Sequence, residues 1–178
     1  AGGAYLPVMC DKYVIVEGAS MFLAGPALVK AAIGQDIDQD TLGGATTHSA
    51  ISGTADYHEK DDLSALKRTR LIMKLMNISS DRAYSNAEYI DPEYSTDDLI
   101  GLFNPENTGI YDVLEIISRL VDGSEFNEYK RQYGKTLVCG TGRIGGMNIG
   151  IVANQRKIAK SKEGEMQMGG VIYSDSAD

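Results

Sequence analysis

A polar stretch at residues 77–111 constrains the fold more than any other feature of this sequence. It is rich in Ser, Asp and Asn, contains Pro92, Pro105 and four Tyr residues, and holds few aliphatic side chains. A stretch of this composition buries too little apolar surface to build a core of its own. We therefore interpret it as a linker, which predicts one folded segment over residues 1–76 and a second over residues 112–178.

Hydrophobic periodicity predicts a helix-rich first segment. A β-branched and aromatic run at residues 13–16 predicts a short buried strand. Residues 45–58, rich in Thr, Ser, Gly and His, predict loop and short strand. Helices are expected at Pro26–Ile33, at 38–43 and at 60–76.

The period changes in the second segment, where strands are expected. Helices are predicted first, at 112–121 and at about 125–133, and a helical turn at 97–103 inside the linker. Strands are predicted at 136–139, 142–144 and 149–153, with Gly145-Gly146 in the tightest turn. Residues 155–168 are polar and are expected to be mobile. Together the two segments predict an α/β fold.

Charge and cysteine usage exclude several classes of protein. The 178 residues carry 17 Lys and Arg against 25 Asp and Glu, a net charge of −8, which argues against nonspecific nucleic-acid binding. No apolar run reaches the ~18 residues that a membrane span needs. Cys10 and Cys139 lie in apolar company and are expected to be reduced core residues, which indicates a reducing compartment.

The two ends predict a longer protein. The sequence has no initiating Met and no signal peptide, and it stops in a Ser- and Asp-rich stretch typical of a helix cap. We expect this chain to be an internal segment.

Two patterns with possible chemistry do not develop into sites. Gly140-x-Gly142-x-x-Gly145 fits a dinucleotide fingerprint, but a strand follows it where that fingerprint requires a helix. A hairpin is therefore the better interpretation. His48 and His58 are the only His residues, and no Cys lies near them at metal-ligand spacing, so no metal site is expected. His48 remains open between a catalytic base and a residue that braces a loop.

Two short patterns could hold an anion. Adjacent backbone N–H groups at Gly2-Gly3 can point at one spot and form an oxyanion hole, or the pair can serve a tight turn. The helix that starts at Pro26 offers a second N-terminus with a positive dipole end. Either pattern alone is weak.

Several segments together, in order and at family-like spacing, resemble the carboxyltransferase (beta) subunits of biotin-dependent acyl-CoA carboxylases of the propionyl-CoA and methylcrotonyl-CoA type. They are AGGAY at 1–5, MFLAGP at 21–26, LGGA at 42–45 followed by His48, LVCG at 137–140, GIVAN at 150–154 and GGVIY at 169–173. The resemblance covers nearly the whole chain and is poorest in the linker.

The resemblance implies a crotonase-like (ClpP/crotonase) fold, a spiral of ββα units, with parts of two such domains. Residues 1–76 would complete the N-terminal carboxyltransferase domain, 77–111 would link, and 112–178 would begin the C-terminal domain. The activity implied is carboxyl transfer between carboxybiotin and the α-carbon of an acyl-CoA through a thioester enolate. Gly2 and Gly3 would form the catalytic oxyanion hole. Contacts to acyl-CoA would come from Ala1, Phe22, Leu23, Ala24, Gly25 and Pro26.

The resemblance also implies partners and a location. A biotin carboxyl carrier protein and a biotin carboxylase subunit would deliver carboxybiotin, and the full protein would be a homo-oligomer, a hexamer, in the cytoplasm or the mitochondrial matrix. The second oxyanion hole would lie downstream of Asp178, so the isolated segment is expected to be inactive. The alternatives are an acyl-CoA decarboxylase, a scaffold without catalysis and a biotin-free crotonase such as a hydratase. The acyl group stays open.

Overall fold

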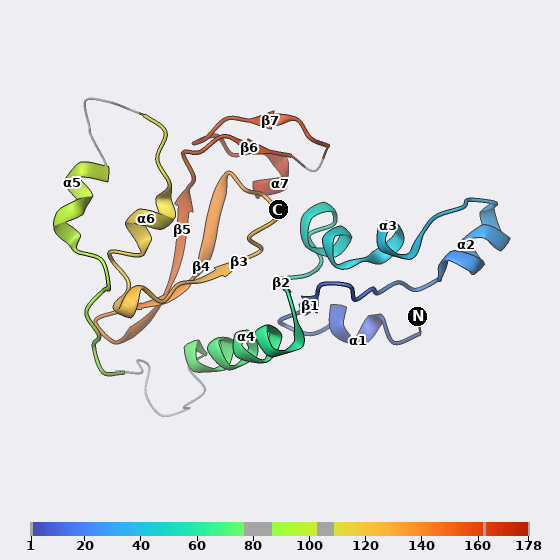
Figure 1. Cartoon of the computed structure of the whole chain (residues 1–178), viewed down its shortest axis with the longest axis horizontal. Helices are drawn as coiled ribbons and strands as arrows, with labels where there is room; N and C mark the ends of the chain where they lie inside the picture. The colour runs from blue at the N-terminus through green and yellow to red at the C-terminus, as the bar shows by residue number, and fades with distance from the viewer. Residues whose placement is uncertain (1, 77–86, 103–108, 162, 178) are drawn as a thin grey trace. The chain divides into compact units, whose positions relative to one another are not determined.

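The computed structural model describes residues 2–76, 87–102, 109–161 and 163–177, and the chain forms two compact units, Ala1–Thr69 and Arg70–Asp178 (Figure 1). The elements that precede the unit boundary are α1 (Tyr5–Val8), β1 (Val14–Val16), α2 (Pro26–Ile33), α3 (Gln39–Gly43), the π-helical turn η1 (Thr47–Ile51) and β2 (Tyr57–Glu59), with α4 (Asp62–Leu75) crossing it. The elements that follow are η2 (Thr96–Asp98), α5 (Leu99–Leu102), α6 (Val113–Ile117), η3 (Asp122–Ser124), β3 (Asn127–Tyr129), β4 (Leu137–Ile144), β5 (Met147–Asn154), β6 (Ala159–Lys160), β7 (Met166–Gln167) and α7 (Ser174–Ala177).

The first unit is built on a parallel strand pair. β1 pairs with β2, with Val14 opposite Tyr57, and α2, α3 and η1 lie on the connection between them, as a parallel pair requires. A small core packs around this pair, and burial raises the pKa of its Tyr13 phenol. The core consists of Tyr13, Ile15, Ala45 and Ala55, with Met21 against it.

Local end signals place α2 and α3 where the sequence predicts them, whereas the short helix α1 was not predicted. α2 begins with an extended Gly25 and with Pro26 at its first position, and it ends at Gly34, whose φ of 72° suits glycine. The Asp38 carboxylate caps α3 by accepting from the Thr41 N–H at 2.9 Å. The hydrogen bonds from the Thr41 side chain and backbone hold the pKa of Asp38 below its ordinary value.

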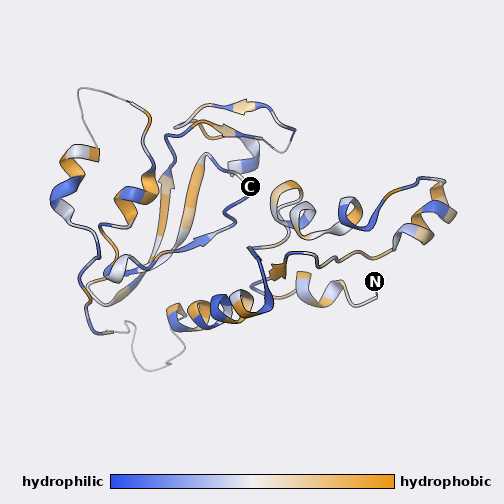
Figure 2. Ribbon diagram, in the orientation of Figure 1, coloured by the Kyte–Doolittle hydropathy of each residue, from blue (hydrophilic) through white to orange (hydrophobic). Residues whose placement is uncertain are grey.

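The second unit is built on an antiparallel sheet of order β3-β4-β5. Gly145 and Gly146 form the two-residue turn between β4 and β5, with φ of 61° and 78°, as the sequence predicts. Figure 2 shows hydrophobic residues along β4 and β5 and on α6. The core of the second unit joins α6 to the sheet, and it consists of Val113, Ile117, Val121 and Val138.

Several predictions for the second unit are wrong in detail. Residues 127–129 form strand β3 rather than part of a helix, because the segment pairs with β4. That pairing needs Gly140, since a Cβ there would lie 2.4 Å from the Phe126 ring. β4 is one continuous strand through residues 137–144, and the stretch expected to be mobile contains the β6–β7 hairpin.

Two expectations for the first unit also need correction. Residues 47–51 form a π-helical turn rather than a loop. Cys10 is exposed and therefore is no core residue, whereas Cys139 is half-buried, and both are free thiols.

The linker is described only in part, because residues 77–86 and 103–108 lie outside the described residues. The helical turn expected at 97–103 is present through residue 102 as η2 and α5.

A buried carboxylate holds the β4–β5 turn. Asp122 is only 7% exposed, and its two oxygens accept from the N–H groups of Gly145 at 2.9 Å and of Gly146 at 2.6 Å. Both N–H groups are therefore satisfied by one side chain that lies outside the hairpin.

Replacing Asp122 by alanine should lower the free energy of unfolding by about 1–3 kcal/mol, because it leaves the buried Gly146 N–H without its acceptor, while the exposed Gly145 N–H can turn to water. Urea denaturation measures this change. The matched control is Asp97→Ala, since Asp97 is exposed. Equal stability of the two variants would contradict the role given to Asp122.

Candidate functional site

The Gly2-Gly3 pair lies just before Ala4, the residue that precedes the first turn of α1. Gly3 accepts from the Leu6 N–H at 3.2 Å, but the N–H groups of Gly2 and Gly3 donate to no described residue. Neither glycine has a positive φ, and a Cβ added to either would meet nothing within 4 Å. The tight-turn interpretation therefore does not explain why both residues are glycine. Two free N–H groups at adjacent positions can stabilise an oxyanion.

The 22–26 segment connects the core of the first unit to the start of α2. Leu23 is 57% exposed, and the N–H groups of Leu23, Ala24 and Gly25 donate to none of the residues described. Pro26 itself has no N–H. The chain before α2 therefore offers three consecutive N–H donors, which end at Pro26, together with the exposed Leu23 side chain. This combination suits a ligand that has both polar and apolar parts.

The structure does not join the two predicted groups to each other. No hydrogen bond among the described residues links Gly2-Gly3 to the 22–26 segment, and Ala1 lies outside those residues. Both groups belong to the first unit, where the pair precedes α1 and the segment precedes α2 (Figure 1).

His48 braces a loop, which is one of the two roles left open by the sequence. Its Nε2 lies 2.7 Å from the carbonyl oxygen of Met21. A carbonyl only accepts, so Nε2 carries a hydrogen and donates it to Met21. Its Nδ1 is buried and has no partner among the described residues, and its ring meets Tyr13 edge-on at a centroid distance of 6.4 Å.

His58 forms a chain of polar contacts that the sequence does not reveal. Its Nδ1 lies 3.2 Å from Ser49 Oγ, and its Nε2 lies 2.5 Å from Glu17 Oε2. The order Ser–His–Glu resembles that of a hydrolase triad, but Ser49 is only 3% exposed, so its hydroxyl is closed to a substrate. The chain links η1 to the two strands of the first unit. We interpret it as structural.

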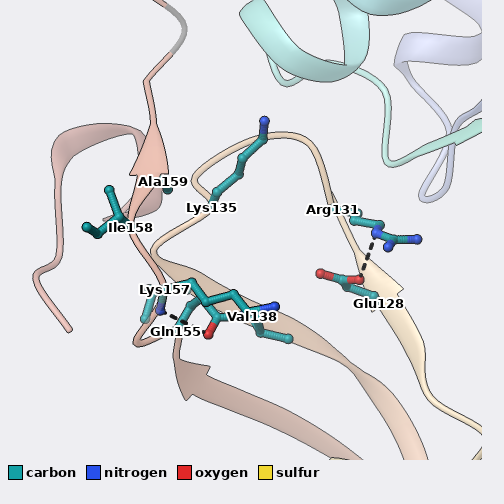
Figure 3. Close-up of a pocket in the computed structure, with 9 residues that line it drawn as sticks. Glu128, Arg131, Lys135, Val138, Gln155, Lys157, Ile158 and Ala159 are labelled. Atoms are coloured by element: carbon teal, nitrogen blue, oxygen red, sulfur yellow. Dashed lines mark hydrogen bonds and ion pairs between the residues drawn. The ribbon is translucent and has the colours of Figure 1, made fainter. Parts of the chain in front are cut away.

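A cavity of about 200 Å³ lies in the second unit, among residues that the sequence predicted to be helix, strand or mobile loop (Figure 3). Its charged side chains are largely paired: Arg131 with Glu128 at 3.4 Å, and Lys157 with Asp112 at 2.6 Å. In Figure 3 the Lys135 side chain extends away from Gln155. The lining residues are Glu128, Arg131, Lys135, Leu137, Val138, Gln155, Lys157, Ile158 and Ala159.

Electrostatics near this cavity favour internal pairing over ligand binding. Burial tends to raise the pKa of Asp112, but hydrogen bonds from Lys157 and Gln155 outweigh it and hold that pKa below its ordinary value. Asp112 is thus an ionised partner for Lys157. In the part of the chain that the structure describes, no group of three His, Cys, Asp or Glu side chains is arranged to hold a metal ion. No helix in that part has the length and apolar character of a membrane span.

Comparison with known proteins identifies relatives over the whole chain. Residues 1–178 match the carboxyl transferase domain family. The chain is 40% identical to the mitochondrial methylcrotonoyl-CoA carboxylase beta chain of Dictyostelium discoideum, over 99% of this chain and 28% of that protein. It is 35% identical to the propionyl-CoA carboxylase beta chain of Saccharopolyspora erythraea, over 100% of this chain and 33% of that protein.

A solved structure supports the same relationship. Transcarboxylase 12S, a hexamer solved with methylmalonyl-CoA bound, is similar with a TM-score of 0.75 and 30% identity, over 87% of this chain and 30% of that one. The crotonase-like α/β fold that the sequence predicts is confirmed by these neighbours, and so is the resemblance to carboxylase beta chains. The chain spans about a third or less of the length of these relatives.

Proposed function

Because the chain belongs to the carboxyl transferase domain family, we propose that it is part of the carboxyltransferase subunit of a biotin-dependent acyl-CoA carboxylase. The reaction moves a carboxyl group between carboxybiotin and the α-carbon of an acyl-CoA. Carboxybiotin supplies that carboxyl group when it is bound. From the resemblance we expect that the residues which hold carboxybiotin lie downstream of Asp178.

The observation that carries this proposal is the state of Gly2-Gly3. Removal of the α-proton turns a thioester into an enolate, whose oxygen carries the negative charge. Two N–H groups that donate to no described residue can stabilise this oxygen, and such donors act most strongly where water is excluded. Because glycine has no side chain, the thioester can approach the backbone at both positions. This role would explain why both residues are glycine, since neither their φ values nor their packing requires it.

Acyl-CoA would lie along the 22–26 segment. Leu23 offers exposed apolar surface, and the N–H groups of Leu23, Ala24 and Gly25 offer donors beside the positive end of the α2 dipole. We assign the acyl-CoA contacts to Phe22, Leu23, Ala24, Gly25 and Pro26, and keep Ala1 as a prediction from the sequence.

The wider organisation follows from the family. Residues 1–76 would belong to an N-terminal carboxyltransferase domain and residues 112–178 to a C-terminal one, joined by 77–111. A biotin carboxyl carrier protein and a biotin carboxylase would be the partners, and the hexamer of transcarboxylase 12S is the expected assembly. The mitochondrial location of the Dictyostelium relative is compatible with the matrix, and the cytoplasm is the other expected compartment.

Reverse carboxyl transfer by the full-length subunit tests this proposal. The subunit is mixed with free biotin and with malonyl-, methylmalonyl-, 3-methylglutaconyl- or glutaconyl-CoA, and loss of the carboxylated thioester is followed. We expect turnover that depends on biotin, fastest with one member of the panel, which would also name the acyl group. A folded oligomer that turns over none of them would contradict the proposal and favour a scaffold or a biotin-free crotonase.

A further inference from the structure

Both backbone groups of Met21, directly before the 22–26 segment, are held by the corner between α3 and η1. The Met21 N–H donates to the Gly43 carbonyl at 2.7 Å, and the Met21 carbonyl accepts from His48 Nε2–H at 2.7 Å. Both distances lie at the short end of the range for N–H···O bonds. We call this arrangement of Met21, Gly43 and His48 the Met21 clamp.

The clamp is closely packed as well as hydrogen-bonded. A Cβ added to Gly43 would lie 2.2 Å from the Met21 oxygen and 3.2 Å from Phe22 Cδ1. A Cβ added to Gly25 would lie 3.3 Å from Phe22 Cε2. The Phe22 ring therefore reaches from the clamp to Gly25, the N-cap residue of α2, so a displacement of Met21 would be passed on to the 22–26 segment.

The backbone of His48 is fixed independently of its side chain. Its N–H donates to the Gly44 carbonyl at 3.1 Å, and its carbonyl accepts from the Ala55 N–H at 2.9 Å. The imidazole uses one nitrogen for Met21 and leaves the buried Nδ1 without a partner in the described part of the chain. A buried polar atom without a partner calls for an explanation. Among the described residues, the His48 side chain therefore makes one hydrogen bond, and its partner is the Met21 carbonyl directly before Phe22.

We propose that His48 is a positioning residue for carboxyl transfer: through the Met21 carbonyl it fixes the 22–26 segment in the place where acyl-CoA binds. This inference rests on the proposed function, because it assigns acyl-CoA to that segment. His48 acts through the peptide and does not touch the reacting atoms.

Two variants of the full-length subunit test the role of His48. His48→Ala removes the donor, whereas His48→Gln keeps an amide N–H that can reach the Met21 carbonyl. We expect His48→Ala to raise the KM for acyl-CoA and the Kd for acyl-CoA without biotin by about tenfold, the equivalent of one lost hydrogen bond. The kcat should change much less, and His48→Gln should restore most of the affinity.

His58→Ala is the matched control, because His58 belongs to the same unit and is hydrogen-bonded to Ser49 and Glu17 instead of Met21. Hydrogen exchange at the Met21 amide, which donates to the Gly43 carbonyl, gives a readout that needs no activity. Exchange at this amide should accelerate in His48→Ala and stay at the wild-type rate in His58→Ala.

The outcomes separate this inference from the proposed function. If the His48 and His58 variants changed KM and hydrogen exchange equally, the positioning role would be overturned. The proposed function would still hold if the wild-type protein transferred carboxyl groups. Wild-type protein that neither transfers carboxyl groups nor binds acyl-CoA would overturn the proposed function and, with it, the acyl-CoA part of the inference. Faster exchange in His48→Ala alone would then identify a purely structural clamp.

Discussion

Replacing Gly3 by valine should lower kcat for carboxyl transfer by about 10²–10³-fold, the usual effect of losing one oxyanion-hole donor. The bulk of valine would keep the thioester oxygen away from the Gly2 and Gly3 N–H groups. The fold should survive, because a Cβ at Gly3 meets nothing within 4 Å and its φ is not positive. Reverse transfer kinetics measure the loss, and the melting temperature and oligomeric state of the variant show that it is folded.

Gly101→Val is the matched control for this experiment. Gly101, in α5, also has open space at its Cβ position and no positive φ, but it belongs to no proposed site. We expect its kcat to stay within about twofold of the wild type, since most exposed substitutions have small effects. A folded Gly3→Val variant with the kcat of this control would rule out the pair as the oxyanion hole.

Replacing Gly43 by alanine should weaken acyl-CoA binding more than tenfold and destabilise the protein by about 1–3 kcal/mol, the usual cost of forcing an extra methyl group into a packed site. The new Cβ would lie 2.2 Å from the Met21 oxygen and 3.1 Å from its carbonyl carbon. Both are backbone atoms, so the Met21 peptide itself must move. The better helix propensity of alanine, about 1 kcal/mol, offsets part of this cost. Acyl-CoA titration and thermal unfolding measure the two effects.

Gly101→Ala separates the clash from helix propensity. This glycine is also helical, and its added methyl group meets nothing, so the same substitution should leave stability unchanged or raise it by about 0.5–1 kcal/mol. If Gly43→Ala behaved like Gly101→Ala in both stability and affinity, the close approach of Gly43 to Met21 would have no role in holding the 22–26 segment.

Local signals were the part of the fold that could be predicted. Pro26 and Gly34 bound α2, Asp38 caps α3, and Gly145-Gly146 turns β4 into β5, because caps and tight turns depend on residues a few positions apart. Strand β3 was predicted as helix, since its conformation depends on pairing with a strand ten residues later through the bare surface of Gly140. Long-range pairing of this kind overrides local propensity.

The candidate site was predictable only as residue types in order. The sequence shows Ser49 one position from His48, yet the structure pairs Ser49 with His58 and gives His48 to the Met21 carbonyl, 27 residues away. The partners differ because η1 is helical, so neighbouring side chains leave it in different directions. The clamp on Met21 could not be found from spacing alone.

The sequence by itself determined the family, the helix ends and the glycine positions, because each is carried by residue identity or by close neighbours. Only the tertiary structure decided what those glycines do. Gly43 and Gly140 are glycine because other parts of the chain occupy the space of a side chain. Gly2 and Gly3 have open space and ordinary φ values, and their N–H groups donate to no described residue. Space and hydrogen-bond partners are properties of the folded chain, and that difference separates the glycines proposed for catalysis from those needed for packing.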